Sequence, residues 1–255
     1  MRWFACYTFA AFISVGCARQ SGPDFPAPAR IEKSVFPLYV LDEQTTKVSG
    51  LKHQRTLANH RGCSAVYVAP HLLVTSATVF SPAVRENITT INIANVMVAD
   101  GDHFLNVEDV PYLDMETGLA LIQTSESGVP ISLQTQLFLQ EPVFFLGFAF
   151  EPVNDFGRLA LVHWKSGPVR PINEVSAAML ELPYFMAEAE IFLGMCGSVV
   201  FDKDKLVAGI IHRRYLDRVS VINASTICKA LKEVENDQDV QSCRVMVDPS
   251  NSLVR

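Results

Sequence analysis

A cysteine in a glycine-rich loop is the residue of this sequence with the clearest capacity for chemistry. Cys196 lies in the segment Gly194-Met195-Cys196-Gly197-Ser198, where glycines on both sides permit a tight turn. A thiol has a pKa of about 8.5, so it supplies a few per cent of nucleophilic thiolate at neutral pH, and a neighbouring imidazolium would increase that fraction. His212 is the candidate partner because it directly follows an apolar run at 206–211. The other histidines lie in turns or at strand ends, where a surface role is expected: His53, His60, His71, His103 and His163.

Short apolar segments of strand length must position these residues. They are rich in Val, Ile, Phe and Thr, and turn signals such as Asp100-Gly101-Asp102 separate them. One helix is expected from 226 to about 235, with a cap within 223–225 and Ile227, Leu231 and Val234 on one face. This pattern predicts an all-β sandwich or barrel followed by a single helix. The predicted strands are 64–68, 72–75, 91–98, 118–123, 143–150, 159–164, 199–201, 206–211 and 219–222.

Three segments, in this order and at these intervals, resemble the signature blocks of the trypsin-like serine proteases. The segment 62–78, which ends in Thr-Ser-Ala-Thr, is similar to the hairpin that ends in the family's Thr-Ala-Ala-His, and 117–122 is similar to the Asp-Ile-Ala-Leu-Leu strand. The segment 193–200 is similar to the Gly-Asp-Ser-Gly-Gly-Pro-Leu-Val loop, and also resembles the Gly-x-Cys-Gly-Gly loop of the viral chymotrypsin-like cysteine proteases. The resemblance covers roughly 62–235. It implies an all-β fold of two six-stranded antiparallel Greek-key barrels, chymotrypsin-like, with a C-terminal α-helix.

The resemblance also assigns catalytic positions, and two of them lack the required chemistry. Thr78 stands where the family has the His that acts as general base, and Gly118 stands where it has the Asp that orients this His. A hydroxyl has no basic form near neutral pH, and glycine has no side chain. Cys196 occupies the nucleophile position, and the amides of Gly194 and Cys196 are expected to form the oxyanion hole. Glu190 stands at the specificity-pocket position, with a solvated loop acid as the alternative.

Whether the chain can still hydrolyse peptides depends on the acids before Gly118 and on the direction of His212. Asp114 and Glu116 are interpreted as solvating the turn before Gly118 rather than as displaced triad acids. The resemblance places His212 where a side chain reaches toward the triad Asp, although a change of register by one residue would turn it into the specificity pocket instead. The expected function is a catalytically inactive pseudoprotease that binds a polypeptide. The alternative is an active cysteine-type endopeptidase that uses Cys196 with His212.

The N-terminus and the cysteines indicate a secreted, periplasmic or cell-envelope protein. A basic start and an apolar run to Val15, with Gly16 and Ala18 at the two key positions, predict a signal peptide cleaved after Ala18. Lipidation of Cys17 is the alternative. The expected organisation is a signal peptide at 1–18, a linker at 19–33, an N-terminal barrel at 34–130, a C-terminal barrel at 131–224, a helix at 225–237 and a tail at 238–255.

Four cysteines follow this signal segment: Cys63, Cys196, Cys228 and Cys243. The last two are expected to form a disulfide that ties the tail to the terminal helix, and four unpaired cysteines are the alternative. No cysteine spacing resembles a zinc site, and no metal or cofactor is expected. The net charge of −6 without a dense basic block argues against nucleic acid as a partner. We expect no membrane span after signal removal, and a monomer.

Overall fold

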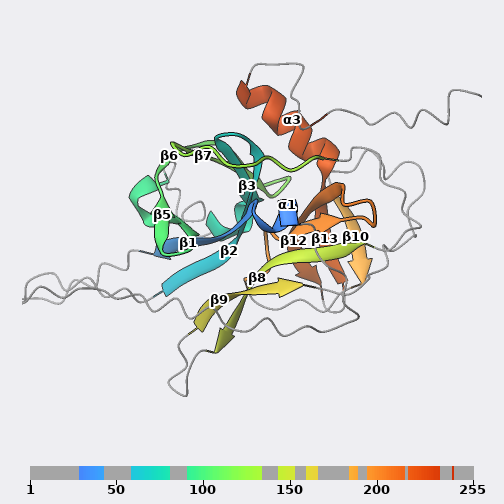
Figure 1. Cartoon of the computed structure of the whole chain (residues 1–255), viewed down its shortest axis with the longest axis horizontal. Helices are drawn as coiled ribbons and strands as arrows, with labels where there is room; N and C mark the ends of the chain where they lie inside the picture. The colour runs from blue at the N-terminus through green and yellow to red at the C-terminus, as the bar shows by residue number, and fades with distance from the viewer. Residues whose placement is uncertain are drawn as a thin grey trace, which may run out of the picture.

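Two antiparallel β-sheets and a C-terminal helix make up the protein, which is described here by a computed structural model (Figure 1). The structure describes residues 29–42, 59–80, 91–133, 143–152, 159–165, 184–188, 194–215, 218–235 and 243. In chain order the helical and strand elements are α1 (Ala29–Glu32), β1 (Val35–Asp42), β2 (Asn59–Ala69), β3 (Leu72–Ser76), the 3-10 helices η1 (Ala77–Phe80) and η2 (Ile93–Asn95), β4 (Val96–Asp100), β5 (His103–Leu105), β6 (Val107–Asp114), β7 (Leu119–Thr124), β8 (Phe144–Pro152), β9 (Leu159–Lys165), β10 (Tyr184–Glu188), β11 (Val199–Phe201), β12 (Val207–Tyr215), β13 (Arg218–Asn223) and α3 (Ala224–Glu235).

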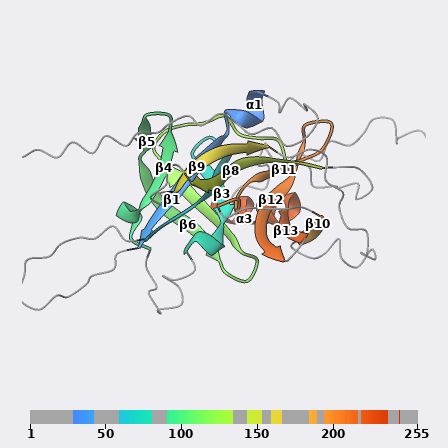
Figure 2. The same cartoon turned by 90° about the horizontal axis from the view of Figure 1, so that it is seen from below.

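The strand orders are those of Greek keys. The first sheet has seven strands in the order β5-β4-β1-β2-β3-β7-β6, in which β4 returns beside β1 after the β1-β2-β3 meander. The second has six strands in the order β10-β13-β12-β11-β8-β9. Figure 2 shows the blue-to-green strands of the first sheet gathered apart from the orange strands β12, β13 and β10 of the second. The predicted chymotrypsin-like fold is confirmed, with seven strands in the first sheet because Asn106 separates β5 from β6.

Most central strands are buried on both faces, which explains why their sequences are almost continuously apolar. In β7, Leu119 and Leu121 join a core shared with the second sheet and with α3, whereas Ala120 and Ile122 face the interior of the first sheet. In β12, Ile210 faces the shared core and Ile211 the interior of the second sheet. Because side chains alternate along a strand, each such strand serves two cores at once. The shared core therefore holds the two sheets together.

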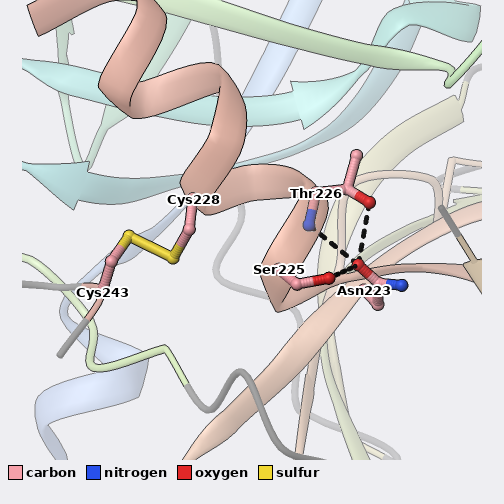
Figure 3. Close-up of a disulfide and its surroundings, with 5 residues drawn as sticks. All are labelled: Asn223, Ser225, Thr226, Cys228 and Cys243. Atoms are coloured by element: carbon pink, nitrogen blue, oxygen red, sulfur yellow. Dashed lines mark hydrogen bonds between the residues drawn. A yellow bond between two sulfur atoms is a disulfide. The ribbon is translucent and has the colours of Figure 1, made fainter. Parts of the chain in front are cut away.

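The helix α3 closes the molecule at its C-terminal end. The side-chain oxygen of Asn223 accepts hydrogen bonds from the Thr226 amide at 2.8 Å and from the Ser225 hydroxyl at 2.7 Å (Figure 3). This is the N-cap arrangement, in which a side chain satisfies an amide left unpaired in the first turn. The predicted disulfide between Cys228 and Cys243 is present, with a Cα–Cα distance of 5.7 Å (Figure 3). It fastens the chain after the helix to the helix itself.

Two observations bear on the ends of the predicted segments. The chain is already folded at Ala29–Glu32, where Ile31 is buried, within the range 19–33 expected to be a linker. All strands of the first sheet precede residue 125 and all strands of the second follow residue 143. The predicted signal segment and the tail after 243 lie outside the described residues. Within the described part of the chain, no helix is long and apolar enough to cross a membrane.

Candidate functional site

The loop that carries Cys196 is fixed between the two sheets. Gly194 and Gly197 have φ angles of +88° and +75°, in the left-handed region that favours glycine. A Cβ on Gly197 would overlap the backbone oxygen of Ser64, so no other residue fits there without movement. The Gly197 amide donates to the Ile211 carbonyl at 2.7 Å, and the Cys196 carbonyl accepts from the Ser64 amide at 2.8 Å. One bond goes to each sheet, and the loop is thereby held at their junction.

Cys196 is a partly buried residue at this junction, and its thiol interacts with the side chains of Cys63 and Thr78. The hydrogen bond with Cys63 lowers the pKa of Cys196, burial opposes this, and the bond with Thr78 lowers the pKa further, so that the net direction is downward. Cys63 is fully buried, and burial raises its pKa well above the ordinary value. Cys196 is therefore the more acidic of the two thiols, and Cys63 keeps its proton.

Thr78, which the sequence resemblance assigns to the family's His position, belongs to a short chain of hydroxyl groups. Its Oγ1 lies 2.8 Å from Oγ of Ser76, in a segment where β3 ends and η1 begins. The Ala77 amide between them donates to the Gly118 carbonyl at 2.7 Å. These contacts hold the Thr78 hydroxyl between Cys196 and the start of β7.

His212 is aimed into this region by an irregularity in its strand. The pairing of β12 with β13 passes from Ile211 opposite Val221 directly to Arg213 opposite Ser220, so His212 is the extra residue of a β-bulge. Its Nδ1 lies 3.2 Å from Oγ of Ser76. The sequence left two directions open for His212, and the side chain takes the one toward the triad Asp position rather than the specificity pocket.

The His212 ring fills the space that the side chain of a residue at position 118 would need. A Cβ built on Gly118 would overlap three atoms of the ring, and Gly118 itself has a φ of +74°. Burial, together with the charge of Arg213, lowers the pKa of His212 to about 4. The imidazole is therefore neutral at pH 7 and lacks the second, acidic ring proton that an imidazolium would pass to a leaving group.

Hydrogen bonds thus run from Cys196 through Thr78 and Ser76 to His212. The Thr78 hydroxyl lowers the Cys196 pKa, so we infer that it donates to the sulfur. The Ser76 hydroxyl has one proton and lies near two oxygen acceptors, Thr78 Oγ1 at 2.8 Å and the His212 carbonyl at 3.4 Å, so the donor at each step depends on the tautomer of His212. Among the described residues, no hydrogen bond joins His212 directly to Cys196.

Comparison with protein-family models shows to which family this chain belongs. The family model described as "Trypsin-like peptidase domain" matches residues 63–210, more than half of the chain. This chain belongs to the trypsin-like peptidase family. No match was found among curated protein sequences.

Solved structures agree on the fold. The active form of the Rv3671c protease of M. tuberculosis is 16% identical, with a TM-score of 0.57, and the match covers 95% of this chain and 97% of that one. Its inactive form is 17% identical, with a TM-score of 0.53 and coverage of 84% and 98%. At these identities the likeness shows the fold alone.

Of the other candidate site residues of this trypsin-like peptidase homologue, Asp114 is described by the structure. Asp114 accepts hydrogen bonds from the Glu116 amide at 2.8 Å and the Thr117 hydroxyl at 2.7 Å. Burial alone would raise the pKa of Asp114, but these hydrogen bonds lower it overall, as suits a carboxylate that organises a turn. Glu190 lies outside the described residues. Among the described residues, no cluster of three or more His, Cys, Asp or Glu could hold a metal ion.

Two residues of the site were not predicted to belong to it. Ser76 bridges Thr78 and His212, and Cys63 contacts Cys196. A signal for Cys63 existed, since pairing the two C-terminal cysteines leaves Cys63 and Cys196 as the other two after the signal segment. No sequence signal distinguished Ser76 from a buried strand residue.

Proposed function

We propose that this chain is a trypsin-like peptidase homologue that binds polypeptides and has lost efficient peptide-bond hydrolysis. One observation carries the proposal: the His212 imidazole contacts Ser76 and packs on Gly118, and a hydroxyl, that of Thr78, interacts with Cys196 where a base is needed. General acid–base catalysis contributes on the order of 10²–10⁴ to such reactions. Without it, a thiolate in an intact loop still cleaves amides very slowly, because nothing protonates the leaving amine.

The backbone of the loop supports polypeptide binding at the same place. Gly194 and Gly197 keep the left-handed conformations that a tight loop requires, and the Cys196 amide donates to no described backbone carbonyl. A substrate carbonyl could therefore dock on the amides of Gly194 and Cys196 as it does on an oxyanion hole. Recognition of an extended chain then needs no working triad.

The first experiment compares the full chain with Cys196→Ala. Both are incubated with a fluorogenic peptide library and, separately, with a thiol-directed peptidyl electrophile. We expect hydrolysis at the background rate for both proteins, while fluorescein-labelled peptides from the same library bind to both. Hydrolysis by the parent protein that disappears in Cys196→Ala would refute the loss of activity.

The second experiment returns the missing base. Thr78→His places an imidazole beside Cys196, and we expect hydrolysis to rise on the order of 10²–10⁴ over the parent. The matched control is Thr78→His combined with Cys196→Ala, which has the base without the nucleophile and should stay at background. A rise of equal size in that control would mean that the site is elsewhere.

The rival function is an active cysteine-type endopeptidase that uses Cys196 with His212. The hydroxyl chain through Thr78 and Ser76 favours it, since it offers a path between sulfur and ring. The low pKa of His212, about 4, weighs against it because such an imidazole is a poor proton acceptor at neutral pH. Thr78→Val separates the two: a Cys196-dependent activity that is lost in this variant and in His212→Gln would establish the endopeptidase.

We further propose that the mature protein is secreted or held in the cell envelope, and is a monomer. The disulfide between Cys228 and Cys243 supports an oxidising compartment, as does the signal-like segment at 1–18. N-terminal sequencing of the exported protein should begin at Arg19, whereas a lipid-modified N-terminus at Cys17 would indicate an anchored lipoprotein. Light scattering after size exclusion tests the monomer.

A further inference from the structure

The contact between Cys63 and Cys196 joins two thiols that are distant in the chain. Both are free, one buried in the interior of the first sheet and one partly exposed in the loop at the sheet junction. The Ser64 amide holds the Cys196 carbonyl at 2.8 Å, so the residue next to Cys63 fixes the loop against β2. Cys196 packs against the core cluster that contains Cys63, and the interaction between the two thiols raises the pKa of Cys63 and lowers that of Cys196.

We propose that Cys63 and Cys196 are a reversible dithiol–disulfide pair, in which Cys196 meets the oxidant and Cys63 resolves it. The oxidant class is a hydroperoxide. This proposal does not depend on whether the chain binds or cleaves polypeptides.

The order of the two steps follows from burial. Cys196 is the less buried of the two residues and has the lower pKa, so its thiolate attacks the terminal oxygen of the hydroperoxide, forms a sulfenic acid, and releases an alcohol (water from hydrogen peroxide) after proton uptake. The sulfur of Cys63 then attacks the sulfur of Cys196, forms the S–S bond and expels hydroxide, which leaves as water with the Cys63 proton. Overall, two thiols and one hydroperoxide give one disulfide, one alcohol and one water.

The Cys63 thiol is enclosed in the interior of the first sheet. The Thr75 hydroxyl lies 3.2 Å from the Cys63 sulfur and also donates to the Ser64 carbonyl at 2.8 Å. Burial raises the pKa of Cys63, so Cys63 remains a thiol until the sulfur of Cys196 has been oxidised. In the disulfide the two sulfurs lie about 2.05 Å apart.

The test uses the full chain, treated with hydrogen peroxide, quenched with a thiol-alkylating reagent and mapped by mass spectrometry without reduction. We expect a cross-linked peptide pair containing Cys63 and Cys196, the loss of both free thiols, and their return with dithiothreitol. The bond between Cys228 and Cys243 is the internal reference and should not change. If Cys196 instead proceeds to sulfinic acid while Cys63 stays a free thiol, or if neither reacts, the proposal is overturned.

Two variants test the assigned order. In Cys63→Ser, the sulfenic acid at Cys196 should persist, react with dimedone and then over-oxidise. In Cys196→Ser, the buried Cys63 should stay reduced at the same peroxide dose. Oxidation of Cys63 in Cys196→Ser as fast as in the parent would contradict the roles, and circular dichroism confirms that each variant is folded.

Discussion

Replacing His212 by Gln should remove much of the acid sensitivity of the protein. The His212 ring is buried, and its pKa is lowered to about 4 from an ordinary 6.5. The groups around it are the Ser76 hydroxyl, the bare backbone of Gly118 and the cation of Arg213, and none of these favours an imidazolium. Folding therefore keeps the ring neutral over a pH range in which the unfolded chain protonates it.

The sign and size follow from proton linkage. Between the folded and unfolded pKa values the unfolded state binds the extra proton, so the free energy of unfolding falls as the pH falls from about 6.5 to about 4. At 1.36 kcal/mol per pKa unit, the whole shift corresponds to about 3 kcal/mol. Between pH 7 and pH 5 the expected loss is about 2 kcal/mol.

The assay is urea denaturation of the parent and of His212→Gln at pH 7 and at pH 5. Gln cannot titrate, so its free energy of unfolding should lose about 2 kcal/mol less over this interval than that of the parent. Carboxylates such as Asp114, whose pKa is lowered, also weaken the fold in acid, but they do so in both proteins and cancel in the difference. The difference in pH dependence is the readout, because the substitution itself changes stability at every pH.

Equal losses in the two proteins would refute the reasoning. They would mean that the folded state protonates His212 as readily as the unfolded chain does, and hence that the ring is not enclosed between Ser76 and Gly118. A larger loss in His212→Gln than in the parent would refute it as well. An NMR titration of the ring protons gives an independent value for the folded pKa.

Three further predictions concern the fold around the site. Gly118→Ala should lower the free energy of unfolding by about 3 kcal/mol, because its φ of +74° disfavours a side chain and the His212 ring occupies the space. The control is Gly101→Ala, where φ is +59° and the surrounding space is open, and it should lose only about 1 kcal/mol. Equal losses in thermal melts would contradict the packing argument. Asn223→Ala should lower the free energy of unfolding by about 1 kcal/mol through loss of the α3 cap, measured by denaturation, and no change would mean that the cap is redundant. Replacing Cys228 and Cys243 by Ser opens a link across a sequence separation of 15 and should destabilise by about 3 kcal/mol, whereas reducing agent should then have no further effect on stability.

The sequence predicted the central strands well because their apolar runs are long. It did not indicate which residues of each strand face the shared core and which face the interior of one sheet. A run such as 119–122 is buried on both sides, and only the packing of the two sheets reveals which residues meet the shared core. The strands that went unpredicted have a different character. β5, β6 and β10 lie at sheet edges, and β1 contains Pro37, a residue unusual in a central strand. Pairing of β1 with β4 begins only at Leu38, which leaves Pro37 opposite β2 alone.

The site was predictable where it depends on residue type and unpredictable where it depends on register. The residue types alone predict that position 78, a threonine, supplies no base and that position 118, a glycine, supplies no carboxylate. The direction of His212 is not, because a single bulged residue decides it and strand alternation carries no sign of a bulge. The meeting of Cys63 with Cys196 depends on the junction of two sheets, a long-range contact that no local pattern encodes.

The substitutions in this site are coupled rather than independent. A buried carboxylate at position 118 without a cationic partner would be costly, so loss of the imidazole at Thr78 removes the reason for keeping an acid at Gly118. The glycine leaves a space that the His212 ring fills, and because no carboxylate among the described residues raises the pKa of His212, burial keeps the ring neutral. The charged pair of an active triad is thereby replaced by uncharged, hydrogen-bonded groups that satisfy one another. Returning a carboxylate to position 118 alone would displace the ring and bury an unpaired charge, so any recovery of hydrolysis must begin at Thr78.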